Sequence, residues 1–92
     1  MTDVKHDSGA TADPLLFTPI TIRGVTAKNR IVVSPMCQYV SEDGMPNDWN
    51  LVHLGRYAFG GASIIYGEET AVEERGRKSY ECAGIWADKH VA

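Results

Sequence analysis

The sequence predicts an α/β fold in which a β-hairpin is followed by one strand–helix–strand unit. Three observations support it: two short apolar runs at residues 30–34 and 62–66, and an apolar helical spacing between them. Runs of β-branched residues without polar alternation are typical of parallel strands buried on both faces. Such strands need neighbours along both edges, so we expect these 92 residues to be an incomplete part of a larger domain.

Composition and charge exclude several classes of function. A net charge of −3 gives no electrostatic footprint for nucleic acid or an anionic membrane. No apolar run approaches the roughly 18 residues of a spanning helix, and no signal-peptide pattern opens the chain. We therefore expect a cytoplasmic protein without nucleic-acid or membrane partners, in which Cys37 and Cys82 are free thiols.

The first elements follow from local patterns. Residues 1–14 are small and polar without a hydrophobic period, which predicts a disordered leader. Ile20 and Ile22 then alternate with polar residues, and Gly24 is expected to supply the turn of a short hairpin. The strand at residues 30–34 is expected to be fully buried and to end before the proline that follows it.

A helix is predicted between the two buried strands. The polar cluster at residues 42–46 indicates a turn, after which Asn47 or Asp48 can cap the helix. One helical face carries Leu51, Leu54, Gly55 and Ala58. Gly60 and Gly61 should end the helix, since glycine tolerates the left-handed conformation. Beyond the second strand we expect a charged solvated loop at residues 73–78, a short apolar stretch at 84–86 and the start of another helix at Asp88.

The predicted topology brings two loops together. A right-handed strand–helix–strand crossover makes the strands parallel, so residues 35–39 and 68–70 fall on one rim. In (β/α) barrels this rim holds the active site. Met36, Cys37 and Tyr39 are unusual for a connecting loop. Two interpretations stay open. Either Cys37 and Tyr39 face a ligand, or Cys37 packs beneath the loop as a small hydrophobic residue and the Tyr39 ring caps the helix–strand interface.

Several motifs resemble those of one enzyme family, in the same order and at the right spacing. They are residues 16–20 (LFTPI), 28–31 (KNRI), 34–39 (SPMCQY), 43–44 (DG), 47–49 (NDW), 52–54 (VHL) and 84–86 (GIW). Together they resemble the Old Yellow Enzyme family, and most closely its bacterial, cysteine-containing ene-reductase branch. The resemblance covers residues 15–92. It implies the N-terminal portion of an incomplete (β/α)8 TIM barrel that binds FMN, with the hairpin closing the bottom of the barrel.

The resemblance also implies roles for individual residues. The positions along the flavin ring would be Ser34, Pro35, Met36 and Cys37. Cys37 would tune the flavin potential, and Tyr39 would face the substrate. The reaction implied is hydride transfer from NAD(P)H to FMN, and from reduced FMN to the C=C bond of an α,β-unsaturated carbonyl compound. The cofactor would carry the difficult chemistry.

Glu69 departs from the family pattern. It occupies a cofactor-contacting position where relatives usually have a small residue, and a carboxylate there would disfavour the anionic reduced flavin. We expect Glu69 to turn into solvent and its removal to leave the flavin potential unchanged. The family's substrate-binding His pair is matched by none of His6, His53 and His90, and we expect His53 to be a packing residue. The 92 residues alone are therefore predicted neither to hold stoichiometric FMN nor to reduce an enone.

Two other functions compete with this interpretation. The chain is either part of an active enzyme or a truncated or split remnant without activity of its own. A metal-binding module would use Cys37, Cys82, His53 and His90, but zinc ligands usually come in closely spaced pairs and these are scattered. The acceptor substrate, the choice of NADH or NADPH and the oligomeric state are left open, although family members often form dimers or tetramers.

Overall fold

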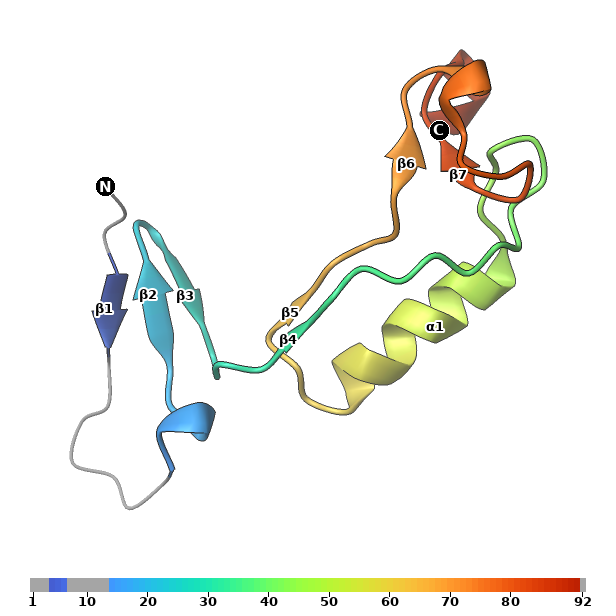
Figure 1. Cartoon of the computed structure of the whole chain (residues 1–92). Coiled ribbons are helices and arrows are strands. Elements are labelled where there is room, and N and C mark those ends of the chain that lie inside the picture. Colours follow the sequence, from blue (N-terminus) through green and yellow to red (C-terminus); the bar gives the residue numbers. More distant parts are fainter. Residues whose placement is uncertain (1–3, 7–13, 92) are drawn as a thin grey trace.

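The computed structural model describes residues 4–6 and 14–91. In this part of the chain, the strands are β1 (Val4–His6), β2 (Ile20–Ile22), β3 (Val25–Ala27), β4 (Val32–Val33), β5 (Ile64–Ile65), β6 (Thr70–Ala71) and β7 (Ala83–Gly84). Helix α1 spans Asp48–Phe59, and 3-10 turns lie at Leu15–Phe17, Glu74–Gly76 and Asp88–His90. Figure 1 shows the β1–β3 sheet at one end, β6 and β7 at the other, and α1 beside the β4–β5 pair between them.

The predicted hairpin is confirmed by the antiparallel pairing of β2 with β3. Thr21 lies opposite Thr26, and their hydroxyl oxygens are 2.9 Å apart. Gly24 lies in the turn as predicted, and the left-handed residue of the turn is Arg23, with φ of 55°. A two-residue hairpin loop needs positive φ at its first position, and here that position falls on Arg23, which adopts a conformation uncommon for side chains other than Gly, Asn and Asp.

Part of the expected disordered leader is a strand. Val4–His6 forms β1, which pairs antiparallel with β2 so that Val4 lies opposite Ile22. The prediction is wrong for these residues because backbone groups on an open strand edge accept any extended segment, whatever its side-chain pattern. The remainder of the predicted leader, residues 1–3 and 7–13, lies outside the described residues.

The strand–helix–strand unit is confirmed. β4 and β5 pair in parallel, with Val32 opposite Ile64, and β4 ends before Pro35 as predicted. Side chains reinforce the start of the pair, since the Asn29 amide donates to the Gly61 carbonyl (2.7 Å). The prediction of a fully buried strand is wrong: Val32 is 50% exposed. Only two strands pair here and α1 packs against β5, so the cover that parallel strands require is incomplete.

Helix α1 begins and ends as predicted. The Asn47 side chain accepts a hydrogen bond from the Trp49 N–H (2.9 Å), and Asn50 accepts one from the Asn47 N–H (2.8 Å), which completes a capping box. Gly61 follows with φ of +102°. His53 is the buried residue of the helix at 5% exposure, consistent with the packing role expected of it, and its Nδ1 lies 3.1 Å from the Arg56 guanidinium.

The second parallel pair, β6 with β7, was not predicted. Its two-residue strands frame the charged loop at residues 73–78, and Cys82 and Ala83 beside it form the buried apolar core of the described residues. The predicted polar turn is confirmed nearby: Asp43 and Gly44 both take positive φ between the paired Glu42 and Met45. No helix in residues 4–6 and 14–91 is long and apolar enough to cross a membrane.

The described residues do not close a barrel. The radius of gyration is 16.9 Å, against about 12 Å for a compact domain of this length. Many large apolar side chains stay exposed, among them Phe59 at 98% and Leu51 at 73%. Leu51 belongs to the apolar helical face found in the sequence, and Leu54 on the same face is 36% exposed, so the described elements cover that face only in part.

Candidate functional site

The loops after β4 and β5 meet at one rim, as the topology predicts. The Gln38 backbone N–H donates a hydrogen bond to Glu68 Oε2 at 2.8 Å. The Gln38 side chain is fixed as well, since it donates to the Met36 carbonyl and accepts from the Trp49 indole, both at 2.8 Å. Glu68 Oε1 is buried without a partner among the described residues. Neither Gln38 nor Glu68 was predicted as a site residue, although both lie in the two segments that were expected to share the rim.

Three potential ligand atoms converge on this rim. The Sγ atoms of Cys37 and Cys82 and a carboxylate oxygen of Glu69 all lie within 4.8 Å of one another. Cys37 is half-buried, Cys82 is buried and Glu69 is exposed. Glu69 thus reaches solvent as expected, but its carboxylate stays beside the thiols. We therefore no longer expect the flavin potential to stay unchanged when Glu69 is removed.

A lysine completes the cluster. Lys78 Nζ lies 5.3 Å from the centroid of the Tyr39 ring. A hydrogen bond to Tyr39, followed by electrostatic interactions with Cys37, Tyr39 and Glu69, raises the pKa of Lys78 above its ordinary value of 10.5. Tyr39 itself is 49% exposed and has a left-handed backbone with φ of 56°. Lys78 was predicted only as part of a solvated loop, because no local pattern reveals its neighbours.

The four-residue metal site considered from the sequence is wrong. His53 is buried against Arg56, whereas His90 contacts the Asp43 carbonyl (2.9 Å) and the Trp86 ring. The two cysteines do meet, with Glu69 as a third donor. The nearby Lys78 ammonium already balances the negative groups there and opposes a metal cation by like-charge repulsion.

One face of the rim fits a flat ring. Residues 34–37 run on from β4 without secondary structure, and Ser34, Pro35 and Met36 are exposed. The N–H groups of Ser34, Met36 and Cys37 donate no hydrogen bond to any residue in the described part of the chain. Free N–H groups beside apolar side chains suit an aromatic heterocycle with carbonyl oxygens and ring nitrogens. The residues present therefore fit one wall of a flavin site.

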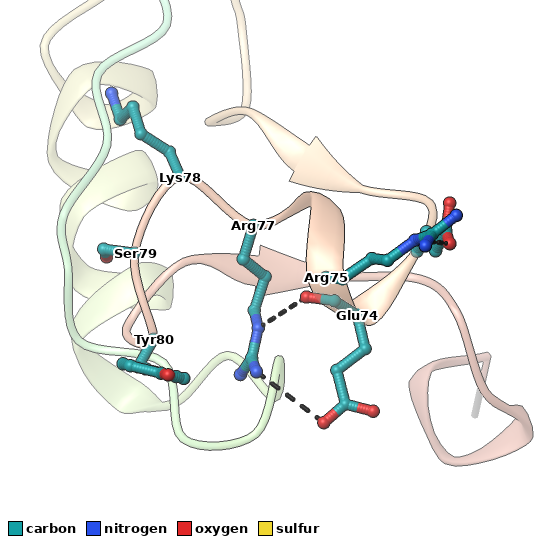
Figure 2. A pocket seen from close by; sticks show the side chains of 7 residues that line it. Glu74, Arg75, Arg77, Lys78, Ser79 and Tyr80 are labelled. Carbon is teal, nitrogen blue, oxygen red and sulfur yellow. Dashed lines mark hydrogen bonds and ion pairs between the residues drawn. The ribbon is translucent and has the colours of Figure 1, made fainter.

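A separate hollow lies on the charged loop (Figure 2). It is lined by Glu73, Glu74, Arg75, Arg77, Lys78, Ser79 and Tyr80. Arg77 bonds to the Glu74 carbonyl at 2.9 Å and carboxylate at 3.7 Å, while the Lys78 side chain extends in the opposite direction. The hollow includes neither Cys37 nor Tyr39 and is bordered by the loop's own paired charges. It is therefore not the site formed by the rim.

Comparison with known families decides the family of the chain. The model of the NADH:flavin oxidoreductase / NADH oxidase family matches residues 15–92. The chain belongs to this family. Its similarity extends to an NADPH dehydrogenase of Geobacillus sp. (strain WCH70), 49% identical over 81 residues, which cover 86% of this chain and 24% of the relative. An NADH:flavin oxidoreductase of Gibberella zeae is 45% identical over 76 residues, covering 83% and 18%.

Solved structures confirm the resemblance to the Old Yellow Enzyme family and the TIM-barrel fold class. A morphinone reductase in complex with tetrahydroNAD matches with a TM-score of 0.73 and 27% identity over 85% of this chain and 21% of that chain. A variant of NCR from Zymomonas mobilis matches with a TM-score of 0.67 and 32% identity, covering 83% and 24%. The chain spans about a quarter of the length of these relatives, or less.

Proposed function

We propose that this chain forms part of an FMN-dependent NAD(P)H oxidoreductase that reduces the C=C bond of α,β-unsaturated carbonyl compounds. The observation that carries the proposal is the convergence of Cys37 and Glu69 past the carboxyl ends of β4 and β5, with Tyr39 beside Lys78, which interacts with both. In barrels of this class the loops at that end hold the reacting groups. When bound, FMN supplies the hydride-transfer chemistry.

The roles of the protein groups follow from their positions. The extended segment at residues 34–37 would lie along the flavin, with its free N–H groups donating to the ring. Cys37 would adjust the flavin's electronics, and the exposed Tyr39 would face the substrate. Lys78 would offset the negative charge of Glu69, which otherwise opposes the anionic reduced ring. Because the described strands leave open edges, we propose that activity requires further strands.

A chimera tests this function. Residues 15–92 would replace the matching part of the Geobacillus NADPH dehydrogenase, whose remaining strands can close the barrel. We expect a yellow protein with stoichiometric FMN that oxidises NADPH in the presence of cyclohexenone. The chain alone should bind no stoichiometric FMN.

Two variants of the chimera locate the activity. Tyr39→Phe should lower enone reduction while FMN stays bound, and Cys37→Ala should shift the flavin potential. Tyr80→Phe is a matched control, because Tyr80 lies just after the charged loop at 80% exposure. A folded chimera that holds no FMN contradicts the proposal that residues 34–37 form one wall of the flavin site. One that holds FMN but reduces no enone contradicts the substrate class and favours the remnant interpretation.

A further inference from the structure

The two cysteines of the chain lie next to each other although they are distant in sequence. Cys37 lies on the loop after β4, and Cys82 directly precedes β7. Both are free thiols, and their Sγ atoms are no more than 4.8 Å apart. A disulfide needs an S–S distance of about 2.0 Å. The two sulfurs would therefore have to approach by at most about 2.8 Å, through side-chain rotation and movement of the Cys37 loop.

The two thiols differ in environment. Cys82 is 2% exposed, and its Sγ lies 3.4 Å from the Ser79 hydroxyl. Cys37 is half-buried on an open loop, within the electrostatic reach of the Lys78 ammonium. A partly exposed thiol beside a cation is where reactive cysteines are found, and redox-sensing cysteines are often placed beside a second, resolving thiol. Cys37 has the surroundings of the reactive cysteine, and Cys82 has those of the resolving cysteine.

We propose that Cys37 and Cys82 form a reversible intramolecular disulfide when the protein meets hydrogen peroxide. The Cys37 thiolate attacks one peroxide oxygen and the O–O bond breaks, which gives a sulfenic acid and a hydroxide ion; the hydroxide takes up the proton that the Cys37 thiol released and becomes water. The Cys82 sulfur then attacks the Cys37 sulfur, so that the S–S bond forms and the S–O bond breaks. The departing hydroxide takes the Cys82 proton and leaves as water. Two electrons pass from the thiols to the peroxide, and a dithiol reductant reverses the step.

The disulfide would change the rim. It draws the Cys37 sulfur towards β7 and away from the open face of residues 34–37. This consequence rests on the proposed function, because it removes the thiol from the flavin wall. The disulfide itself does not depend on flavin, so it can be tested on the 92-residue chain.

The test is peptide mapping of the folded chain after exposure to hydrogen peroxide. We expect both thiols to disappear without a covalent dimer, and dithiothreitol to restore them. Trypsin cleaves after Arg30 and Arg56, and after Lys78 and Lys89. The oxidised chain should therefore yield one species that links peptides 31–56 and 79–89, and it should vanish on reduction.

Variants assign the two steps. Cys82→Ser should stop at the sulfenic acid of Cys37, which dimedone traps, while Cys37→Ser should leave the buried Cys82 reduced. Lys78→Met should slow disulfide formation several-fold, on the order of threefold to tenfold. Lys28→Met is the matched control, since it removes the same charge from an exposed residue of the hairpin region and should leave the rate unchanged.

Three outcomes overturn the proposal. The thiols stay unlinked in the folded chain, only intermolecular dimers form, or the disulfide closes no faster in the folded chain than in concentrated guanidinium chloride. The last comparison separates a placed pair from random closure of a long loop. A disulfide that forms in a chain whose chimera binds no FMN refutes the proposed function and leaves this inference intact. A yellow, active chimera whose thiols never link supports the proposed function and refutes the disulfide.

Discussion

The backbone N–H of Gln38 donates a 2.8 Å hydrogen bond to the carboxylate of Glu68, 30 residues further along the chain. This bond joins the loop after β4 to the loop after β5. The register of the parallel pair determines which residues can meet there, since Val33 lies opposite Ile65 just before both loops. The rim is therefore held by one charge-assisted bond as well as by the sheet.

Glu68→Ala should remove this bond and lower the free energy of unfolding by about 1.5–3 kcal/mol, because hydrogen bonds to charged groups contribute roughly that much. Hydrogen exchange should also accelerate at the Gln38 amide. The matched control is Glu73→Ala, whose side chain is 59% exposed and pairs only with Arg75 at the surface. It should cost less than about 0.5 kcal/mol. Equal effects of the two variants would refute the role of Glu68 in holding the rim.

Gly84→Ala and Gly55→Ala should change stability in opposite directions. A Cβ at Gly84 would collide with the Trp86 ring, so the variant should lose about 1–3 kcal/mol. A Cβ at Gly55, inside α1, meets no described atom within 4 Å. Alanine there should add about 0.5–1 kcal/mol through helix propensity. Urea unfolding measures both; a destabilised Gly55→Ala would show that this helical face is covered in solution.

Stability should fall at acidic pH through Asp43. The hydrogen bond and charge of Lys89 hold the pKa of Asp43 below its ordinary value of 3.8. A depressed carboxyl pKa stabilises the fold above pH 3.8, and this contribution is lost as the pH falls through the lowered value. Lys89→Met should return the pKa of Asp43 towards 3.8 in an NMR titration, whereas Lys28→Met should not. An Asp43 pKa that is unaltered in Lys89→Met would exclude the pair in solution.

Lys78 and Glu69 should have opposite effects on the flavin of the chimera. Lys78→Met removes a positive charge and should lower the midpoint potential, while Glu69→Gln should raise it. Shifts on the order of 30 mV correspond to about 1.4 kcal/mol for a two-electron couple. Potentiometry with a reference dye measures both. Shifts of the same sign would contradict the compensation of these charges.

Local features of the fold were predictable from the sequence. The capping side chain of Asn47, the positive φ of Gly61 and the end of β4 before Pro35 depend on residues adjacent in the chain. The shared rim followed from the parallel crossover alone. Burial was not predictable. The apolar run that includes Val32 is typical of a strand covered on both faces, but other elements must provide that cover. The described residues provide little of it, so Val32 is exposed.

The rest of the site depends on contacts that no local pattern encodes. β6 and β7 have two residues each, and the short apolar stretch at residues 84–86 overlaps β7 only at Gly84, so nothing marked them as strands. Their pairing is what carries Cys82 to Cys37. Lys78 likewise reaches Tyr39 only because the charged loop folds back over the rim. Cys37 and Tyr39 were predictable as residues of this rim, whereas no local pattern marked Cys82 and Lys78, which lie beside them.

The open edges of the β4–β5 pair make protein concentration an experimental variable. Backbone donors and acceptors on such an edge accept a strand from another molecule as readily as one from the same chain. The exposed side chains of Phe59 and Leu51 also favour association between molecules. Dilute samples should therefore behave as monomers, whereas concentrated ones should scatter light and bind hydrophobic dyes until added strands cover the sheet.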